Sequence, residues 1–93
     1  MRHRADLNQK EIVYGLRKIG ASVQVLSGVG KGCPDLLVGF RCQNYLFEIK
    51  QSLKSKLTKD EAIFAYAWNG KVYIVYDLQQ AINILTAKGG GGK

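Results

Sequence analysis

The chain has 93 residues, which allows one small domain with a single core and excludes two independent domains. Its formal net charge is +7, and such an excess attracts polyanions through phosphate neutralisation, although lysine-rich surfaces also serve solubility alone. No stretch is long or apolar enough to span a bilayer, and no signal-peptide pattern precedes the first helix. We therefore expect a cytoplasmic protein that binds nucleic acid and has no membrane partner.

The chain is predicted to open with an amphipathic helix. This helix begins near Asp6, whose side chain can cap it with Gln9 reciprocating, and it ends at Gly20. Its buried stripe is expected to consist of Ile12, Leu16 and Ile19.

Three strands are predicted next, over residues 21–26, 35–40 and 44–50. A glycine-rich loop at residues 27–32 separates the first two strands. Residues 41–44 make the hairpin turn between the second and the third.

The second half reads as a helix, a strand and a helix. A capping-box pattern occurs at Thr58-Lys59-Asp60-Glu61, so a helix is predicted to begin there and to stop at Asn69-Gly70. A β-branched and aromatic strand covers residues 71–76, and Asp77 with Gln80 caps the last helix. The inner faces are expected to be Ile63, Phe64, Ala67 and Trp68 in the first of these helices and Leu78, Ala81, Ile82 and Leu85 in the second.

The resulting element order is αβββαβα. Three consecutive strands followed by a helix, a strand and a helix predict an α/β domain with a mixed sheet flanked by helices. This single domain is expected over residues 1–88, and residues 89–93 form a glycine-rich tail that we expect to be disordered.

Charged side chains interrupt two of the apolar strands at fixed places. Side chains alternate between the faces of a strand, so Glu48 and Lys50 point together, away from the apolar packing of Phe47 and Ile49. A proline before Asp35 suits a strand entry and sets this aspartate at the sheet rim beside Glu48. A carboxylate in a hydrophobic strand needs an ion partner, a solvated cleft or a metal. The pattern therefore indicates a divalent-cation site for phosphodiester cleavage, with a Glu48–Lys50 pair on a solvated face as the alternative.

With these residues the chain resembles the PD-(D/E)xK nuclease superfamily, and within it the VRR-Nuc (virus-type replication-repair nuclease) domains that occur alone in phages. The resemblance runs from about residue 7 to residue 84. It rests on Glu11 in the first helix, on the Gly-Cys-Pro segment ending at Asp35, on Glu48-Ile49-Lys50, and on the Leu57-Thr58 opening of the next helix. It implies a restriction-endonuclease-like core and metal-dependent hydrolysis of DNA.

The resemblance also implies roles for individual residues. Glu11, Asp35 and Glu48, together with the backbone carbonyl of Ile49, would hold Mg²⁺ or Mn²⁺. Lys50 would lie next to the attacking water and orient or deprotonate it. The predicted catalytic residues are therefore Glu11, Asp35, Glu48 and Lys50.

Where relatives often carry a glutamine after the motif, this chain has Glu61. Its negative charge would sit awkwardly near a phosphate, so we expect Glu61 to contact Lys50 or Lys59, or to serve only in the helix cap. Lysines of the glycine-rich loop, of the basic connector at residues 52–56 and of the following helix are expected to contact DNA phosphates. They are Lys31, Lys54, Lys56 and Lys59.

Stand-alone phage relatives are regarded as resolvases of branched DNA. The resemblance therefore implies a homodimer that cuts Holliday junctions, acting in the host-cell cytoplasm if phage-encoded, because a twofold dimer presents two active sites. A nicking or flap nuclease in replication and repair is one alternative. A non-catalytic nucleic-acid-binding module is the other, and three converging acids beside a polyanion argue against it.

Overall fold

A computed structural model describes residues 4–87 of the chain and the side chains of residues 7–87. The predicted tail at residues 89–93 lies outside the described residues, and so do residues 1–3 and residue 88 of the predicted domain. The predicted αβββαβα order is confirmed. Its elements are α1 (Arg4–Lys18), β1 (Ser22–Val25), β2 (Leu36–Phe40), β3 (Gln43–Ile49), α2 (Lys59–Ala67), β4 (Val72–Val75) and α3 (Leu78–Thr86).

The strands form one sheet in the order β1-β2-β3-β4. β1, β2 and β3 are antiparallel neighbours, whereas β4 runs parallel to β3, so the sheet is mixed as predicted. The parallel pair needs a crossover connection, and α2 lies within it. β2 and β3 are joined by a turn of only two residues, Arg41 and Cys42, with φ of 52° and 66°. This turn is shorter than the predicted one at residues 41–44, and its positive φ angles match the twist of a tight hairpin.

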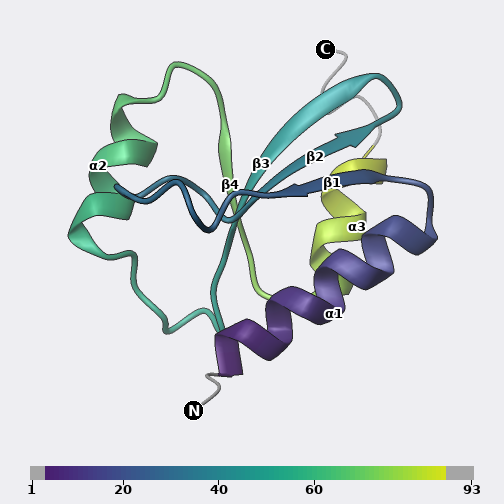
Figure 1. The fold of residues 1–93 in the computed structure, drawn as a ribbon, viewed down its shortest axis with the longest axis horizontal. Coiled ribbons are helices and arrows are strands. Elements are labelled where there is room, and N and C mark those ends of the chain that lie inside the picture. Colours follow the sequence, from purple (N-terminus) through teal and green to yellow (C-terminus); the bar gives the residue numbers. More distant parts are fainter. Residues whose placement is uncertain (1–3, 88–93) are drawn as a thin grey trace.

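α1 and α3 lie side by side on one face of the sheet and cover the core (Figure 1). The two helices approach closely at Gly15, where a Cβ would collide with the side chain of Leu78. The buried apolar core comprises Ile12, Val13, Leu16, Ala21, Leu36, Val38, Phe47, Ile49, Val75, Ala81 and Leu85.

The first helix differs from its prediction at both ends. α1 already includes Arg4, so Asp6 lies within the helix, and the side chain of Asp6 lies outside the described residues. At the other end, α1 stops at Lys18. Ile19 therefore follows the helix and is 40% exposed, and Val13 is buried in its place.

α2 lies at the other end of the sheet from the α1–α3 layer and contributes no buried residue (Figure 1). The predicted inner face of this helix is therefore wrong. Ile63 is 56% exposed and Trp68 is 49% exposed; Ala67 is exposed as well, and only Phe64 is partly buried. The rotation of α2 about its own axis is set by contacts of its first turn with the site described below. An apolar stripe does not set it.

Candidate active site

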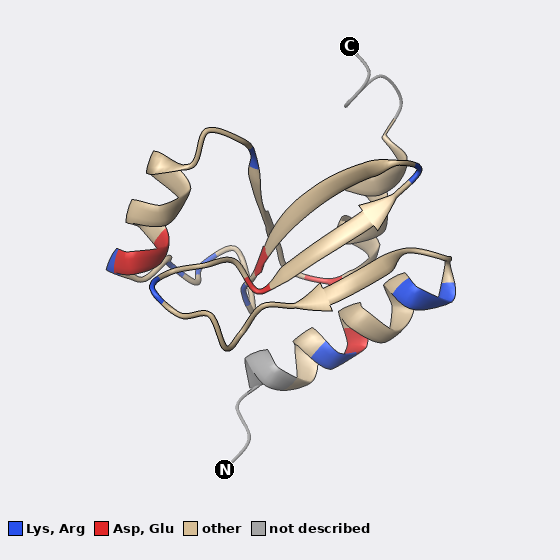
Figure 2. Ribbon diagram, turned by 45° about the horizontal axis from the view of Figure 1, so that its top comes forward, with Lys and Arg blue, Asp and Glu red and all other residues tan. Residues whose placement is uncertain are grey.

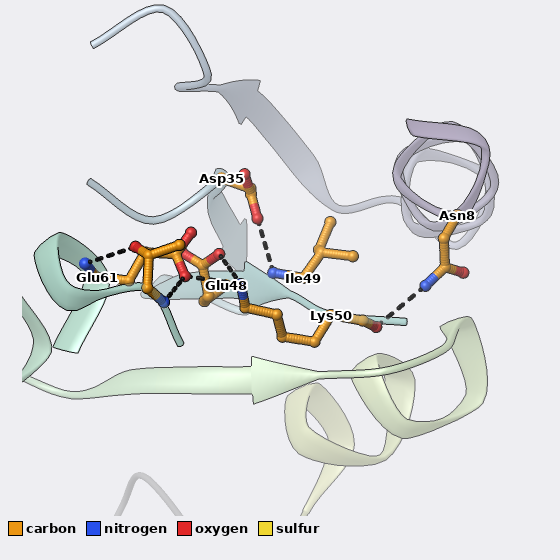
Figure 3. A network of polar contacts seen from close by, with 7 residues as sticks. Asn8, Asp35, Glu48, Ile49, Lys50 and Glu61 are labelled. Carbon is orange, nitrogen blue, oxygen red and sulfur yellow. Dashed lines mark hydrogen bonds and ion pairs between the residues drawn. The ribbon is translucent and has the colours of Figure 1, made fainter. Parts of the chain in front are cut away.

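The two strand carboxylates meet where β2 begins. Continuing the antiparallel register one step beyond Leu36↔Phe47 sets Asp35 opposite Glu48. Opposed residues of an antiparallel pair place their side chains on the same face, so the two carboxylates come together. Glu48 is only 3% exposed, and Asp35 is partly buried. Figure 3 shows both side chains in one network with Lys50 and Glu61.

The pairing of β2 with β3 ends at Leu36, and Pro34 cannot extend it. One further step of the register would set Pro34 opposite Ile49, but proline has no N–H to donate to the Ile49 carbonyl. The Ile49 N–H donates instead to Asp35 Oδ2, at 2.8 Å (Figure 3). Because the N–H and the carbonyl of such a strand residue point to the same neighbour, the Ile49 carbonyl is directed toward the Asp35 side.

Lys50 follows directly after β3 and is held between two carboxylates. Its Nζ lies 2.6 Å from Glu61 Oε1 and 3.8 Å from Glu48 Oε2. Glu61 also closes the capping box of α2, because its Oε1 accepts from the Thr58 N–H at 2.9 Å and its own N–H donates to Thr58 Oγ1 at 3.2 Å. The expectation that Glu61 contacts Lys50 is confirmed, and so is the predicted cap.

Crowding of these acids changes their protonation. Burial, followed by the negative charges of Asp35 and Glu61, raises the pKa of Glu48 to about 9. Burial also raises the pKa of Asp35, although its hydrogen bond from Ile49 opposes this. Partial burial acts against ionisation of Glu61 too, but hydrogen bonds from Lys50 and Thr58 outweigh it and lower the pKa of Glu61 below its usual range. Of the three acids, Glu61 is therefore the one best stabilised as an anion.

The strand residues fit a divalent cation. Carboxylate and carbonyl oxygens are the hard ligands that Mg²⁺ and Mn²⁺ prefer, and Asp35, Glu48 and the Ile49 carbonyl supply them on one side of the sheet. The ammonium that contacts this group among the described side chains, that of Lys50, is shared with Glu61. Two crowded carboxylates with raised pKa values are thus short of positive charge, which a cation would supply.

Glu11 is not grouped with Asp35 and Glu48 among the described side chains, and its predicted role as a third metal ligand stays a prediction. Among the described side chains, no group of three or more His, Cys, Asp or Glu residues is placed to share a metal ion. Glu11 is exposed on α1 and lines a surface hollow of about 420 Å³ with Gln51 and Tyr76. In Figure 2 the acidic position on α1 is separate from those of the sheet and of α2.

Asn8, which the sequence analysis did not single out, is the α1 side chain that reaches the strand ends. Its Nδ2 donates to the Tyr76 carbonyl at 2.9 Å. It also donates to the Lys50 carbonyl at 3.4 Å (Figure 3). This contact fixes the start of α1 against the ends of β3 and β4. An isolated asparagine inside a helical pattern carries no sequence signal for such a role.

The glycine-rich loop before β2 rests on the first turn of α2. Gly32, with φ of 79°, approaches the carbonyl of Asp60 so closely that a Cβ would collide with it. This contact sets the loop and α2 on the two sides of the site. The predicted DNA-contacting lysines are all exposed, and within residues 7–87 none pairs with a carboxylate; they are Lys31, Lys54, Lys56 and Lys59.

A solved structure described as a "VRR_NUC domain" superposes on 94% of this chain and 99% of its own, with a TM-score of 0.69 and 23% sequence identity. The chain has the fold of a VRR_NUC domain. The restriction-endonuclease-like core predicted from the sequence is thereby confirmed. No family model and no curated protein matches the sequence. Within residues 4–87, no helix of this VRR_NUC fold has the length and apolarity needed to cross a membrane.

Proposed function

We propose that this chain is a VRR-Nuc-type nuclease that hydrolyses DNA phosphodiester bonds with Mg²⁺ or Mn²⁺. The observation that carries the proposal is the meeting of Asp35, Glu48 and Lys50 beside the start of β2, within the fold of a VRR_NUC domain. A protein that only bound DNA would gain nothing from two crowded carboxylates, one buried and one partly buried, next to a polyanion. An enzyme that must place a cation against a phosphate needs them.

Asp35, Glu48 and the carbonyl of Ile49 are the proposed metal ligands. A bound divalent cation supplies Lewis-acid polarisation of the scissile phosphate and makes an attacking water more acidic. Two features of the chain position these ligands. The β2–β3 ladder stops before Pro34, and the Ile49 N–H holds the Asp35 carboxylate by a hydrogen bond. Glu11 is left out of the proposed set because no described trio of acids is placed to share an ion.

Lys50 is the residue proposed to act on the attacking water. Its ammonium lies 3.8 Å from Glu48 and can stabilise the negative charge that builds on the phosphate. Unlike an arginine, a lysine can also exchange a proton with a water that it orients. Glu61, 2.6 Å from the same Nζ, gives this ammonium a fixed place before the substrate arrives.

We further propose that two copies act on branched DNA, with the Holliday junction as the substrate that a twofold dimer fits. The face of the sheet opposite α1 and α3 supports this proposal. Leu37 is 38% exposed there, and with Leu46 and Trp68 it lines a hollow of about 400 Å³ whose only charged lining residue is Lys71. Two such faces can pack together without opposing many like charges.

Cleavage of defined substrates tests the proposal. A four-way junction, a flap and a linear duplex are incubated with the protein in Mg²⁺, Mn²⁺ or EDTA, alongside Asp35→Asn. Asp77→Asn is the matched control, because Asp77 caps α3, is not one of the proposed ligands, and can be replaced by asparagine, which caps a helix equally well. We expect metal-dependent cutting that Asp35→Asn abolishes and Asp77→Asn retains.

The pattern of cutting separates the alternatives. Preference for the flap or the nicked strand would favour the repair-nuclease alternative over junction resolution. Metal-dependent binding without cutting of any substrate by the wild type would refute the nuclease proposal and favour a binding module. The cytoplasmic location stays a prediction from the sequence.

A further inference from the structure

The exposed side of α2 carries one basic and two large apolar side chains in line. Lys59, Ile63 and Tyr66 are spaced four and three residues apart, so they share one face of the helix. Ile63 is 56% exposed and Tyr66 is 93% exposed. A tyrosine ring so fully in solvent makes no contribution to the core, and the packing of this domain gives no reason for it.

This stripe lies on the far side of α2 from the candidate active site. Glu61 faces Lys50, and Ile63 and Tyr66 follow it by two and five residues. At 3.6 residues per turn these two positions lie roughly opposite Glu61, across a helix about 10 Å wide. One side of α2 therefore faces the candidate active site, and the stripe on its other side is exposed to solvent.

Charge indicates what occupies the stripe. Lys59 lies within it and Lys54 and Lys56 precede it, whereas the exposed acids of residues 54–66 amount to Asp60 alone. A second copy of this chain seated on the same stripe through a twofold axis would gather the lysines of both copies at one interface without supplying acids to pair with them. DNA supplies phosphates for these lysines and base faces for an aromatic ring.

We infer that α2 is a branch-point wedge, with the end base pair of the DNA arm next to the cut arm stacking on Ile63 and Tyr66. This inference rests on the proposed function, because it assumes that DNA lies at Asp35 and Glu48. Inside a continuous duplex every base pair is stacked on both sides, so the stripe can be used only at a branch or at an open duplex end. Phosphates at the branch reach Lys59 and the lysines before it.

Binding measured without cleavage tests the inference. The Asp35→Asn protein in EDTA is titrated at fixed salt into a labelled four-way junction and into a duplex of the same sequence, the arm ends of both being closed by hairpin loops. Adding Tyr66→Ala is expected to weaken junction binding about ten-fold, because one base–aromatic stack is lost. Duplex binding should weaken less than about two-fold. Tyr66→Phe keeps the ring and should retain junction binding. Tyr14→Ala, which removes a 66% exposed tyrosine from α1, should leave both affinities unchanged.

A fluorescent base analogue locates the contact. With 2-aminopurine in the branch-end base pair, we expect protein binding to quench its fluorescence when residue 66 is tyrosine or phenylalanine and to leave it unquenched when residue 66 is alanine. Equal losses on junction and duplex, no loss on either, or a fall in sedimenting mass caused by Tyr66→Ala would each overturn the inference. The last result would identify the stripe as a contact between copies.

These outcomes are independent of catalysis. If the wild type cuts DNA but Tyr66→Ala binds junctions normally, the wedge is wrong and the nuclease proposal stands. If the wild type cuts nothing while the Tyr66 effect on junction binding holds, the nuclease proposal fails and α2 is still the branch-binding element. A melting curve of each variant verifies that it is folded.

Discussion

The raised pKa of Glu48 makes the stability of the metal-free protein depend on pH. The pKa of Glu48 moves from an ordinary value of 4.5 to about 9 on folding. Below pH 4.5 the folded and the unfolded chain both hold this proton. As the pH rises toward 9 the unfolded chain releases it and the folded chain keeps it, so stability falls over this window.

The size of the effect follows from proton linkage. One proton held by the folded state alone gives a slope of about 1.4 kcal/mol per pH unit, so the free energy of unfolding should fall by about 2–3 kcal/mol from pH 6 to pH 8. Burial also raises the pKa of Asp35 above its ordinary value of 3.8. This carboxyl therefore also lowers the free energy of unfolding as the pH rises above 3.8. Glu61 has a lowered pKa, and the stability that it contributes is lost only as the pH falls below 4.5.

Guanidinium unfolding at pH 6, 7 and 8 in EDTA measures this slope. Glu48→Gln replaces the protonated carboxyl with a neutral amide of the same shape and should remove most of the slope, making the variant more stable than the wild type at pH 8. Glu11→Gln, which changes an exposed acid, is the matched control and should keep the wild-type slope. Equal slopes for the wild type and Glu48→Gln would refute the reasoning.

Added Mg²⁺ should stabilise the wild type more at pH 8 than at pH 6, because the ion binds the deprotonated carboxylates and must displace their protons at the lower pH. With one proton displaced, the apparent affinity should rise about ten-fold per pH unit. Titration calorimetry at the two pH values measures this. A pH-independent affinity would mean that Glu48 is not a ligand.

Three further substitutions address single residues. Lys50→Ala should keep Mg²⁺ binding in calorimetry while cleavage slows at least about 100-fold, whereas loss of metal binding would assign Lys50 a structural role instead. Glu11→Gln should keep Mg²⁺ affinity and Asp35→Asn should lose it; loss in both would place an α1 ligand on the metal. Gly32→Ala should lower the free energy of unfolding by about 1–3 kcal/mol, because φ is 79° there and the added Cβ would collide with Asp60 of α2. Gly28→Ala is the control and should cost less than about 0.5 kcal/mol, because a Cβ at residue 28 would meet open space.

Much of the site was predictable because a strand fixes its side chains by alternation. Glu48 and Lys50 had to share a face, and a proline before Asp35 had to end the ladder near them. Local capping signals likewise identified Thr58 and Asp77, whose side chains accept from the backbone three residues on. These features depend on spacings of two or three residues, which a sequence displays directly.

Features that depend on how one element is rotated against another were not predictable. Whether Asn8 or Glu11 of α1 meets the strand ends is decided by packing around Gly15 and Leu78. The face of α2 was misassigned because its apolar residues surround the helix, and an ion pair rather than an apolar stripe determines its orientation. The hairpin turn was misjudged because Arg-Cys lacks the usual Asn-Gly signal for positive φ.

One oxygen of Glu61 accepts from both the Thr58 N–H and the Lys50 ammonium, so a single atom joins the start of a helix to the candidate chemistry. A substitution that removes this oxygen therefore alters both bonds at once. A drift to alanine at position 61 would fray the helix and free the lysine together, while a drift to glutamine would spare the helix and weaken only the tether. Among descendants of this sequence, positions 50, 58 and 61 should therefore change as a set.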